Sequence, residues 1–243
     1  MSEPSAAPAR PRRTRLILAA LAVFTVFALA ALGTWQVQRL FWKRDLIARI
    51  DARIHAEPAA PPAKAQWPGI NPRDDEYRRL RLEGVFDNSR ETLVYASTEL
   101  GPGAWVVTPL AQADGTTILV NRGFVPGEKR DPESRAAGQP QGPVTVTGLM
   151  RMDEPGGTLL QANRPDENRW YSRDTRAIAA ARGLADVAPY FVDADATPNS
   201  GGWPVGGLTR VALPNSHLMY AVTWYAMAIG LAAALVQVFR RRW

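Results

Sequence analysis

The residue best suited to chemistry in this chain is His217, one of only two histidines among 243 residues. Imidazole is the commonest metal ligand in proteins, and much of it is uncharged at neutral pH. His217 stands at the entrance to an uncharged apolar run, Leu218–Phe239, and aromatic residues follow it. An imidazole placed at the edge of a bilayer in this way is suited to a lipid-soluble metal cofactor.

Helical spacing brings further side chains beside this imidazole. If Asn215 or Ser216 caps the helix, His217 falls in its first turn, where the helix dipole favours the uncharged ring. Tyr220 and Trp224 then share a helical face with His217 and form aromatic walls beside it. The residues alone leave two interpretations open. One is a cofactor site, and the other is the aromatic belt that is common at membrane interfaces.

Two segments are long and apolar enough to cross a membrane. Leu16–Trp35 has 20 residues and Leu218–Phe239 has 22, without a charged side chain in either, and about 20 apolar residues span a hydrocarbon core. The first run is longer than the core of a signal peptide and continues into Gln36 without a polar break. We therefore expect an uncleaved transmembrane helix over 16–35 and a second over 215–239. Small residues at Ala226 and Gly230 would let the two helices pack closely.

Basic residues predict the orientation of these spans. Three arginines, Arg240–Arg242, outweigh Arg210 on the other side of the second span, so its C-terminus is expected in the cytoplasm. Two spans return the chain to its starting side, which makes 1–15 and 240–243 cytoplasmic basic tails, or matrix tails in an organelle. Five basic residues on the far side of the first span oppose this, but long translocated segments obey the rule weakly. They are Arg39, Lys43, Arg44, Arg49 and Arg53.

Charge and cysteine content exclude several classes of function. The sequence pI near 10.0 is typical of proteins that bind nucleic acid. However, seven of the 29 basic residues lie in the tails, and the region between the spans has equal numbers of basic and acidic residues. The basic character therefore reflects topology, and we expect no nucleic-acid partner. Without cysteine, the chain forms no disulfide and holds no thiolate-ligated metal.

The exported part is predicted to be one domain on a stem. A juxtamembrane helical stem (36–56) precedes a proline-rich extended connector (57–72), and a β-rich domain (73–214) follows. One short helix, Asp174–Arg182, is capped by Asp174 and stopped by Gly183. The expected fold is a membrane α+β protein, with transmembrane helices at both ends of a small sheet or barrel-like domain. The predicted strands are 77–86, 91–97, 104–110, 116–124, 144–150, 190–192 and 209–213.

No hydrolase, nucleotide or metalloprotease motif is present, so we expect no enzymatic activity. The other histidine, His55, lies in the stem, away from any folded cleft. Adjacent acids such as Asp153-Glu154 are predicted to be solvated surface residues. The step Asn121-Arg122-Gly123 leaves an apolar strand, and two interpretations stay open. It is either only a turn, or it presents the planar fork of Arg122 to a carboxylate or propionate.

Several short segments carry a family resemblance, and together they cover nearly the whole chain between its tails. They occur in this order: Gly33-Thr34-Trp35-Gln36 with Arg39 and Trp42-Lys43; Leu82–Asp87; Val107–Leu110; Leu119–Gly123; Asn168–Tyr171 with Asp174; and Asn215–Leu218 with Tyr220-Ala221 and Thr223-Trp224. In this order, between two terminal spans, they resemble the Surfeit locus family of cytochrome c oxidase assembly factors, in its bacterial form. Two positions depart from the family pattern, since Phe124 replaces a common tryptophan and Met219 a common glutamine.

The resemblance implies a two-span protein of the bacterial inner membrane, with its central domain outside the cytoplasm. It also implies a chaperone of the respiratory chain that receives haem a from the machinery of haem a synthesis and assists its delivery to the oxidase catalytic subunit. His217 is then the expected axial ligand of the haem iron, shielded by Tyr220 and Trp224. Trp35 and Gln36 would close the site from the facing helix, and Arg39 or Lys43 would meet the propionates. The alternative is a cofactor-free scaffold that binds immature oxidase subunits.

Overall fold

The computed structural model describes residues 12–211 and 213–242. These residues form two compact units, which we call the helix pair (12–48 and 213–242) and the β domain (49–211). Most of the predicted N-terminal tail, up to residue 11, lies outside the described residues, as do residues 212 and 243.

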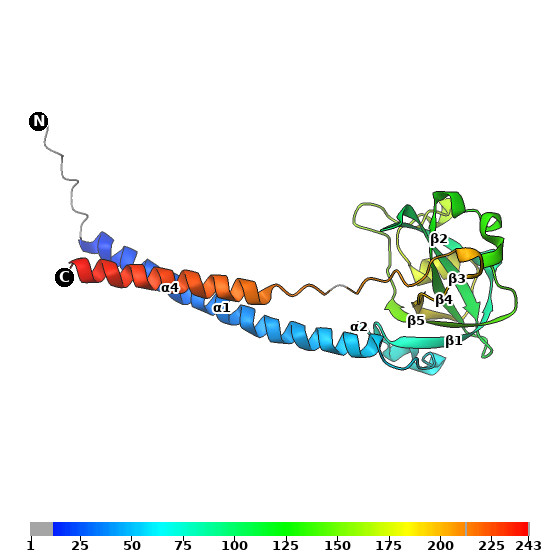
Figure 1. Cartoon of the computed structure of the whole chain (residues 1–243), viewed down its shortest axis with the longest axis horizontal. Coiled ribbons are helices and arrows are strands. Elements are labelled where there is room, and N and C mark those ends of the chain that lie inside the picture. The colour runs from blue at the N-terminus through cyan, green and yellow to red at the C-terminus, as the bar shows by residue number, and fades with distance from the viewer. Residues whose placement is uncertain (1–11, 212, 243) are drawn as a thin grey trace, which may run out of the picture. The chain divides into compact units, whose positions relative to one another are not determined.

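The helix pair consists of α1 (Arg12–Ile54), whose first 37 residues belong to it, and α4 (His217–Arg242). The two helices run antiparallel, because the start of α1 and the end of α4 lie at the same end of the pair (Figure 1). At about 1.5 Å per residue, α1 is about 65 Å long, roughly twice the thickness of a hydrocarbon core. One continuous helix therefore contains both the predicted span and most of the predicted stem.

Large apolar side chains cover the outside of both helices. Phe24, Phe27 and Ile229 are 69%, 70% and 69% exposed. Apolar surface of this extent is unfavourable in water and is typical of a segment that lies in lipid. Both helices are long and apolar enough to cross a membrane, over Leu16–Ile54 and His217–Arg241. The prediction of two apolar helices at the ends of the chain is confirmed.

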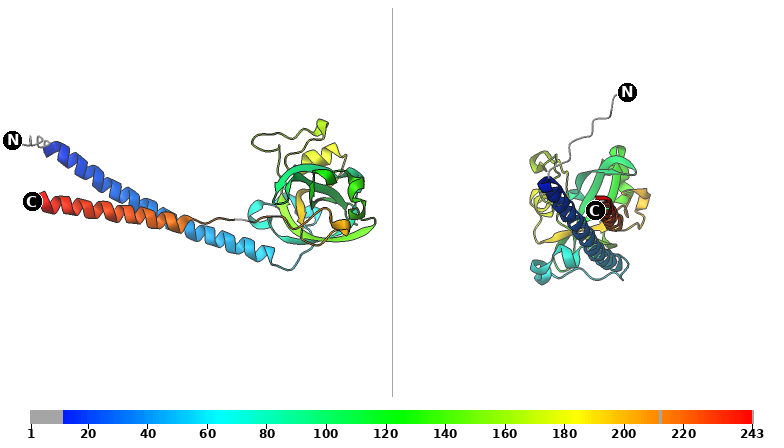
Figure 2. Two further views of the ribbon diagram at one scale, coloured as in Figure 1. Left: turned by 45° about the horizontal axis from the view of Figure 1, so that its top comes forward. Right: turned by 90° about the vertical axis from the view of Figure 1, so that its left-hand side faces the viewer.

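The β domain is built on a six-stranded sheet in the order β1-β5-β6-β4-β3-β2. A further pairing of β1 with β3, through Val85–Ala111 and Phe86–Leu110, closes five strands into a barrel and leaves β2 at the edge. Figure 2 shows the curled strands of this barrel. The strands are β1 (Arg79–Phe86), β2 (Thr92–Thr98), β3 (Gly101–Ala111), β4 (Thr117–Pro126), β5 (Pro143–Met152) and β6 (Val187–Ala194).

Alternation along the strands divides the core into two clusters. Val120 of β4 and Tyr190 of β6 pack inside the barrel with Leu80 and Leu82 of β1. The intervening residues of β4 and β6, such as Leu119, face the opposite side and pack against Trp170 and Ile178. Successive side chains of a strand point to opposite faces, and here both faces are covered. For this reason eight successive residues of β4 are buried.

The predicted short helix is present as α3 (Thr175–Ala181). The Asp174 carboxylate accepts a hydrogen bond from the Ala177 amide at 2.9 Å, as expected of an N-cap. Gly183 follows the helix with φ of 61°, the left-handed conformation that ends many helices. Both sequence-based assignments at the ends of this helix are confirmed.

Other local predictions differ from the structure. The connector is not extended throughout, because a 3-10 helix (Lys64–Gly69) and a four-residue helix, α2 (Pro72–Asp75), interrupt it. Residues 209–211 form no strand. Instead, the Thr209 hydroxyl donates to the Asp193 carboxylate at 2.9 Å.

The small residues expected at the helix–helix contact are also not the ones used. Ala226 and Gly230 are exposed, whereas Gly33, Ala221 and Ala228 are buried. The contact therefore lies on a different face of α4 from the one that the spacing of Ala226 and Gly230 suggested.

Candidate functional site

His217 is the first residue of α4 and is half-buried. The Ser216 carbonyl accepts the Tyr220 amide at 3.3 Å, so the first helical hydrogen bond spans His217. The imidazole therefore lies in the first turn, as predicted. The backbone at the start of a helix has N–H groups without partners inside the helix, together with the positive end of the helix dipole.

The nearest polar group to this imidazole comes from the other helix of the pair. Nδ1 of His217 lies 2.7 Å from Oε1 of Gln36 on α1. An amide oxygen has no proton to donate, so Nδ1 must carry the proton of this hydrogen bond. In the neutral form of the ring, Nε2 then keeps its lone pair. In metalloproteins the same arrangement fixes the tautomer and the orientation of a ligating histidine.

Close packing nearby holds the two helices at this distance. A Cβ atom on Gly33 would come within 2.9 Å of the Tyr225 ring, so only glycine fits there without a shift of the ring. The hydroxyl groups of Thr34 and Tyr225 lie 2.9 Å apart and form a hydrogen bond between the helices. Two hydrogen bonds and the packing of the Tyr225 ring on Gly33 thus hold α1 against α4 over the first turns of α4.

The other predicted site residues surround this contact to different degrees. Trp224 is half-buried one turn further along the face of Tyr220, which is 55% exposed. Trp35 is adjacent to Gln36, so its side chain points about 100° away around the helix, and it is 54% exposed. The Arg39 guanidinium lies 3.7 Å from the centroid of the Trp42 ring. The structure therefore brings Gln36 into contact with His217. Among the described residues, His217 forms no side-chain hydrogen bond with the four other predicted residues, Tyr220, Trp224, Trp35 and Arg39.

Tyr225 was missed by the sequence reasoning, although a signal was available. Hydroxyl side chains inside apolar spans tend to bond across helices, and Thr34 and Tyr225 are such residues. Only helix packing shows that they meet. Within the described residues, no cluster of three or more His, Asp or Glu side chains has the geometry to hold a bare metal ion.

Asn121-Arg122-Gly123 is not a turn, so the interpretation of this step as only a turn is wrong. It lies inside β4, where the pairing with β3 shifts between Trp105–Phe124 and Val107–Asn121. The one extra residue on β4 makes this a β-bulge. Gly123 has φ of 132°, and a Cβ there would come within 2.2 Å of the Val205 carbonyl oxygen. Only glycine allows this strand to bulge so close to the segment at Val205.

A buried network of charges, also missed from sequence, lies beside the bulge. The Asp193 carboxylate accepts from Asn121 at 2.7 Å, from Arg151 at 3.0 Å and from Arg173 at 3.0 Å. Arg173 also binds Glu154 through two nitrogens. Buried charges are tolerated when they are paired in this way. The network ties β4, β5 and β6 together, and its partners are too far apart in sequence for spacing to reveal them.

The expectation that Asp153 and Glu154 are merely solvated is wrong. Asp153 accepts from the amide and hydroxyl of Thr175 at 2.7 Å and 2.8 Å and holds the start of α3. Burial acts to raise the pKa of Glu154, but the hydrogen bonds and charge of Arg173 outweigh it, so the pKa lies below its usual value. Both acids are engaged in structural contacts.

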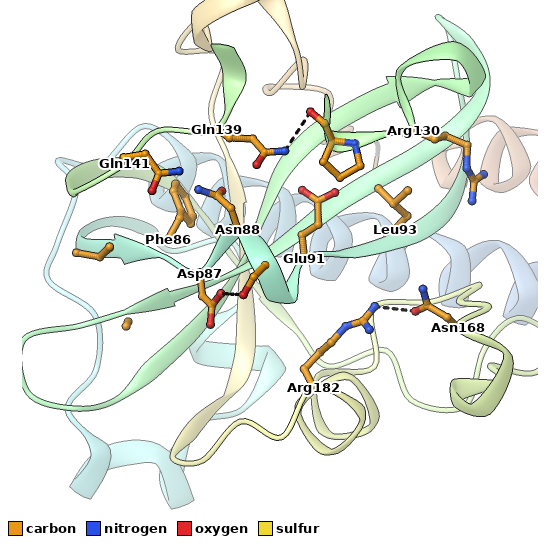
Figure 3. Close-up of a pocket in the computed structure, with 14 residues that line it drawn as sticks. Phe86, Asp87, Asn88, Glu91, Leu93, Arg130, Gln139, Gln141, Asn168 and Arg182 are labelled. Carbon is orange, nitrogen blue, oxygen red and sulfur yellow. Dashed lines mark hydrogen bonds between the residues drawn. The ribbon is translucent and has the colours of Figure 1, made fainter. Parts of the chain in front are cut away.

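A broad hollow of about 990 Å³ also lies on the surface of the β domain, shown in Figure 3. Three of its charged side chains, those of Asp87, Glu91 and Arg182, pair with their neighbours. Arg182 donates to Asn168 at 2.6 Å and to Thr92 at 2.8 Å, and Asp87 accepts from Ser89 at 2.6 Å. Because these partners satisfy one another, the hollow is a weaker candidate for a cofactor site than the contact of His217 with Gln36.

Comparisons with known proteins agree on one family. The model of the SURF1 family matches residues 23–229. Surfeit locus protein 1 of Mus musculus is 41% identical over 227 residues, which cover 87% of this chain and 72% of the relative. The human protein of the same name is 41% identical over 220 residues, covering 84% and 70%. A SURF1-like protein of Monosiga brevicollis is 39% identical over 229 residues, covering 87% and 82%.

Proposed function

The chain belongs to the SURF1 family, and from that premise we propose that it assists cytochrome c oxidase assembly by holding haem a at His217. It receives haem a from the machinery that synthesises it and passes the haem to the oxidase catalytic subunit. The haem is cargo, and the protein carries it without transforming it.

The hydrogen bond between His217 and Gln36 carries this proposal. It leaves Nε2 of a neutral imidazole with a free lone pair, which is the form that ligates haem iron. A lone histidine is a poor site for a bare metal ion. It is sufficient for iron that arrives with four porphyrin nitrogens, so the donor set of this site fits a haem.

The surrounding residues suit the two ends of such a cargo. Tyr220 and Trp224 offer aromatic surface beside the imidazole for an apolar macrocycle. Trp35 adds exposed aromatic surface one residue from Gln36. Arg39, one turn further along α1, supplies a cation suited to the propionates. The exposed apolar flanks of both helices would accommodate the long hydrocarbon tail in lipid.

A carrier must also release what it binds. One protein ligand at a half-exposed position gives a smaller binding free energy than two buried ligands would, and it leaves the other axial face free. A partner that supplies a second ligand can therefore take over the haem. This argument favours transfer over permanent storage.

Substitution of His217 tests the proposal directly. The full-length protein is purified from cells that synthesise haem a, and its absorption spectrum is recorded. His217→Ala is expected to lose at least 90% of the haem, because the iron loses its protein ligand. The matched control is His55→Ala, since His55 is 73% exposed in the stem, and it should keep the haem. Equal haem occupancy in the two variants would contradict the assignment.

The cofactor-free scaffold remains the second candidate, and one observation favours it. Leu159 and Leu160, on a loop of the β domain, are 101% and 91% exposed, as expected of an apolar contact for a protein partner. A scaffold would contain no haem when purified from the same cells, while a deletion strain would still lack mature oxidase. The spectrum therefore separates the two functions.

A further inference from the structure

A small cavity of about 230 Å³ lies in the β domain, beside the bulge of β4. Its wall combines apolar and polar groups from four strands, from the segment before β5 and from the loop after β6. These include Phe86 of β1, Arg122 of β4, Val144 and Thr145 of β5, and Asp195 and Asn199 of the loop that follows β6. The volume corresponds to several water molecules at about 30 Å³ each, enough for a ligand of a few heavy atoms.

Arg122 brings a buried positive charge to this wall. The side chain is only 2% exposed, and its guanidinium carbon lies 4.8 Å from the centroid of the Phe86 ring. Nη2 donates to the Gly138 carbonyl and, at 3.3 Å, to Oδ1 of Asn199. Nη1 is buried and has no hydrogen-bond partner among the described residues. A buried donor without an acceptor is unfavourable in free energy, more so on a charged group, and is therefore suited to bind an acceptor from a ligand.

Neighbouring acids do not neutralise this arginine. Glu91 already accepts two hydrogen bonds from Arg135, and the two side chains are 7% and 1% exposed. Asp195, on the cavity wall, accepts instead from the amide and hydroxyl of Thr197 at 3.0 Å and 2.6 Å. Burial lowers the pKa of Arg122 to about 10, with Glu91 opposing the shift and Arg135 adding to it. At neutral pH the guanidinium therefore stays charged.

We propose that this cavity is a binding site for a small carboxylate, which pairs with the guanidinium of Arg122. The carboxylate replaces the long contact from Asn199 and spans Nη1 and Nη2, the two-pronged geometry that a guanidinium favours. Phe86 and Val144 pack against the short carbon chain, and the Thr145 hydroxyl lies at the rim. The carboxylate belongs either to a free acid of a few carbons or to the C-terminus of a peptide.

The test measures the thermal midpoint of the full-length protein in detergent against sodium butyrate, with sodium chloride at equal ionic strength as the reference. Two tripeptide arms, one with a free and one with an amidated C-terminus, distinguish the sources. We expect a saturable rise with butyrate or with the free peptide, and none with the amide. Either carboxylate supports the site, and the one that binds more tightly identifies the source.

Matched variants at the rim locate the binding. Thr145 is exposed on β5, so Thr145→Trp fills the cavity mouth and Thr145→Val preserves its size. We expect Thr145→Trp and Arg122→Gln to weaken binding at least tenfold, with Thr145→Val and His217→Ala unchanged. The proposal fails if neither carboxylate shifts the wild-type midpoint beyond chloride, or if the Trp and Val variants bind equally. His217→Ala removes the proposed haem ligand. Unchanged carboxylate binding in this variant would therefore show that the cavity binds independently of haem.

Discussion

A single hydrogen bond determines what His217 can offer a ligand. With Gln36 as the acceptor, Nδ1 is protonated, and in the neutral ring Nε2 is free. Without that acceptor, the neutral ring would exchange between its two tautomers and rotate about its side-chain bonds. Partners of this kind commonly change metal affinity 10–100-fold, although they never touch the metal. Gln36 is therefore assigned as a positioning residue.

Gln36→Leu removes the acceptor while keeping the size of the side chain. We expect haem retention to fall about tenfold or more, and the two ring nitrogens to lose their distinct protonation states. The first effect is read from the haem spectrum. The second is read without haem from ¹⁵N chemical shifts of the histidine rings, which are easily assigned because the chain has only two histidines.

Gln38→Leu is the matched control for this substitution. Gln38 lies on the same helix and is exposed, so its replacement adds the same apolar surface without touching His217. If Gln36→Leu and Gln38→Leu gave the same haem retention and the same ¹⁵N shifts, Gln36 would not position the imidazole.

Residue patterns predicted which side chains share a face of α4 with His217, but not which residue of α1 contacts it. His217, Tyr220 and Trp224 follow from helical spacing because they lie within eight residues of one another. Gln36 and His217 are 181 residues apart, and spacing alone cannot pair them. The family resemblance placed Gln36 on the facing helix, and the structure supplies the contact.

Among the elements, α1 and α4 are held together by a close approach at Gly33. Gly33→Val would place its side chain against the Tyr225 ring, which lies within about 3 Å of the position of the new Cβ. Overpacking of this kind typically costs about 1–3 kcal/mol. The prediction is a lower thermal midpoint for the full-length protein in detergent, together with weaker haem retention, because His217 moves away from Gln36.

Gly230→Val is the control, since a Cβ at Gly230 on α4 meets nothing within 4 Å. It makes the same chemical change in the other helix and should leave both the midpoint and the haem unchanged. A Gly33→Val variant as stable as Gly230→Val would show that the helices do not pack through this face.

The strands of the β domain were predicted more completely than their arrangement. Alternating and β-branched segments marked all six strands within a few residues, because that pattern is local. Closure of the barrel through β1 and β3, and the parallel pairing of β4 with β6, depend on contacts between distant segments. The segment 209–213 has the composition of a strand. However, Thr209 bonds to the buried carboxylate of Asp193, and that network outweighs the local preference.

At the scale of the whole molecule, two membrane spans would place the start of α1 and the end of α4 on the same side of the membrane. An antiparallel helix pair brings the start of α1 and the end of α4 together (Figure 1). Arg13, Arg240 and Arg241 flank that end of the pair, and basic residues favour the cytoplasmic side. The basic residues of α1 beyond Trp35 favour the opposite orientation. We expect the basic residues at the ends of the chain, and not those of α1 beyond Trp35, to determine the orientation. A long following domain is translocated largely regardless of its charge.

Cysteine labelling tests this orientation without background, since the chain has no cysteine of its own. Ala136→Cys places a thiol at an exposed position of the β domain, and Ser5→Cys places one in the N-terminal tail. In spheroplasts of a bacterial host that expresses the chain, a membrane-impermeant maleimide is expected to label Ala136→Cys fully and Ser5→Cys only after lysis. The reverse pattern would put the β domain in the cytoplasm. Haem at His217 would then be presented on the cytoplasmic face, and delivery to the oxidase would have to start from that side.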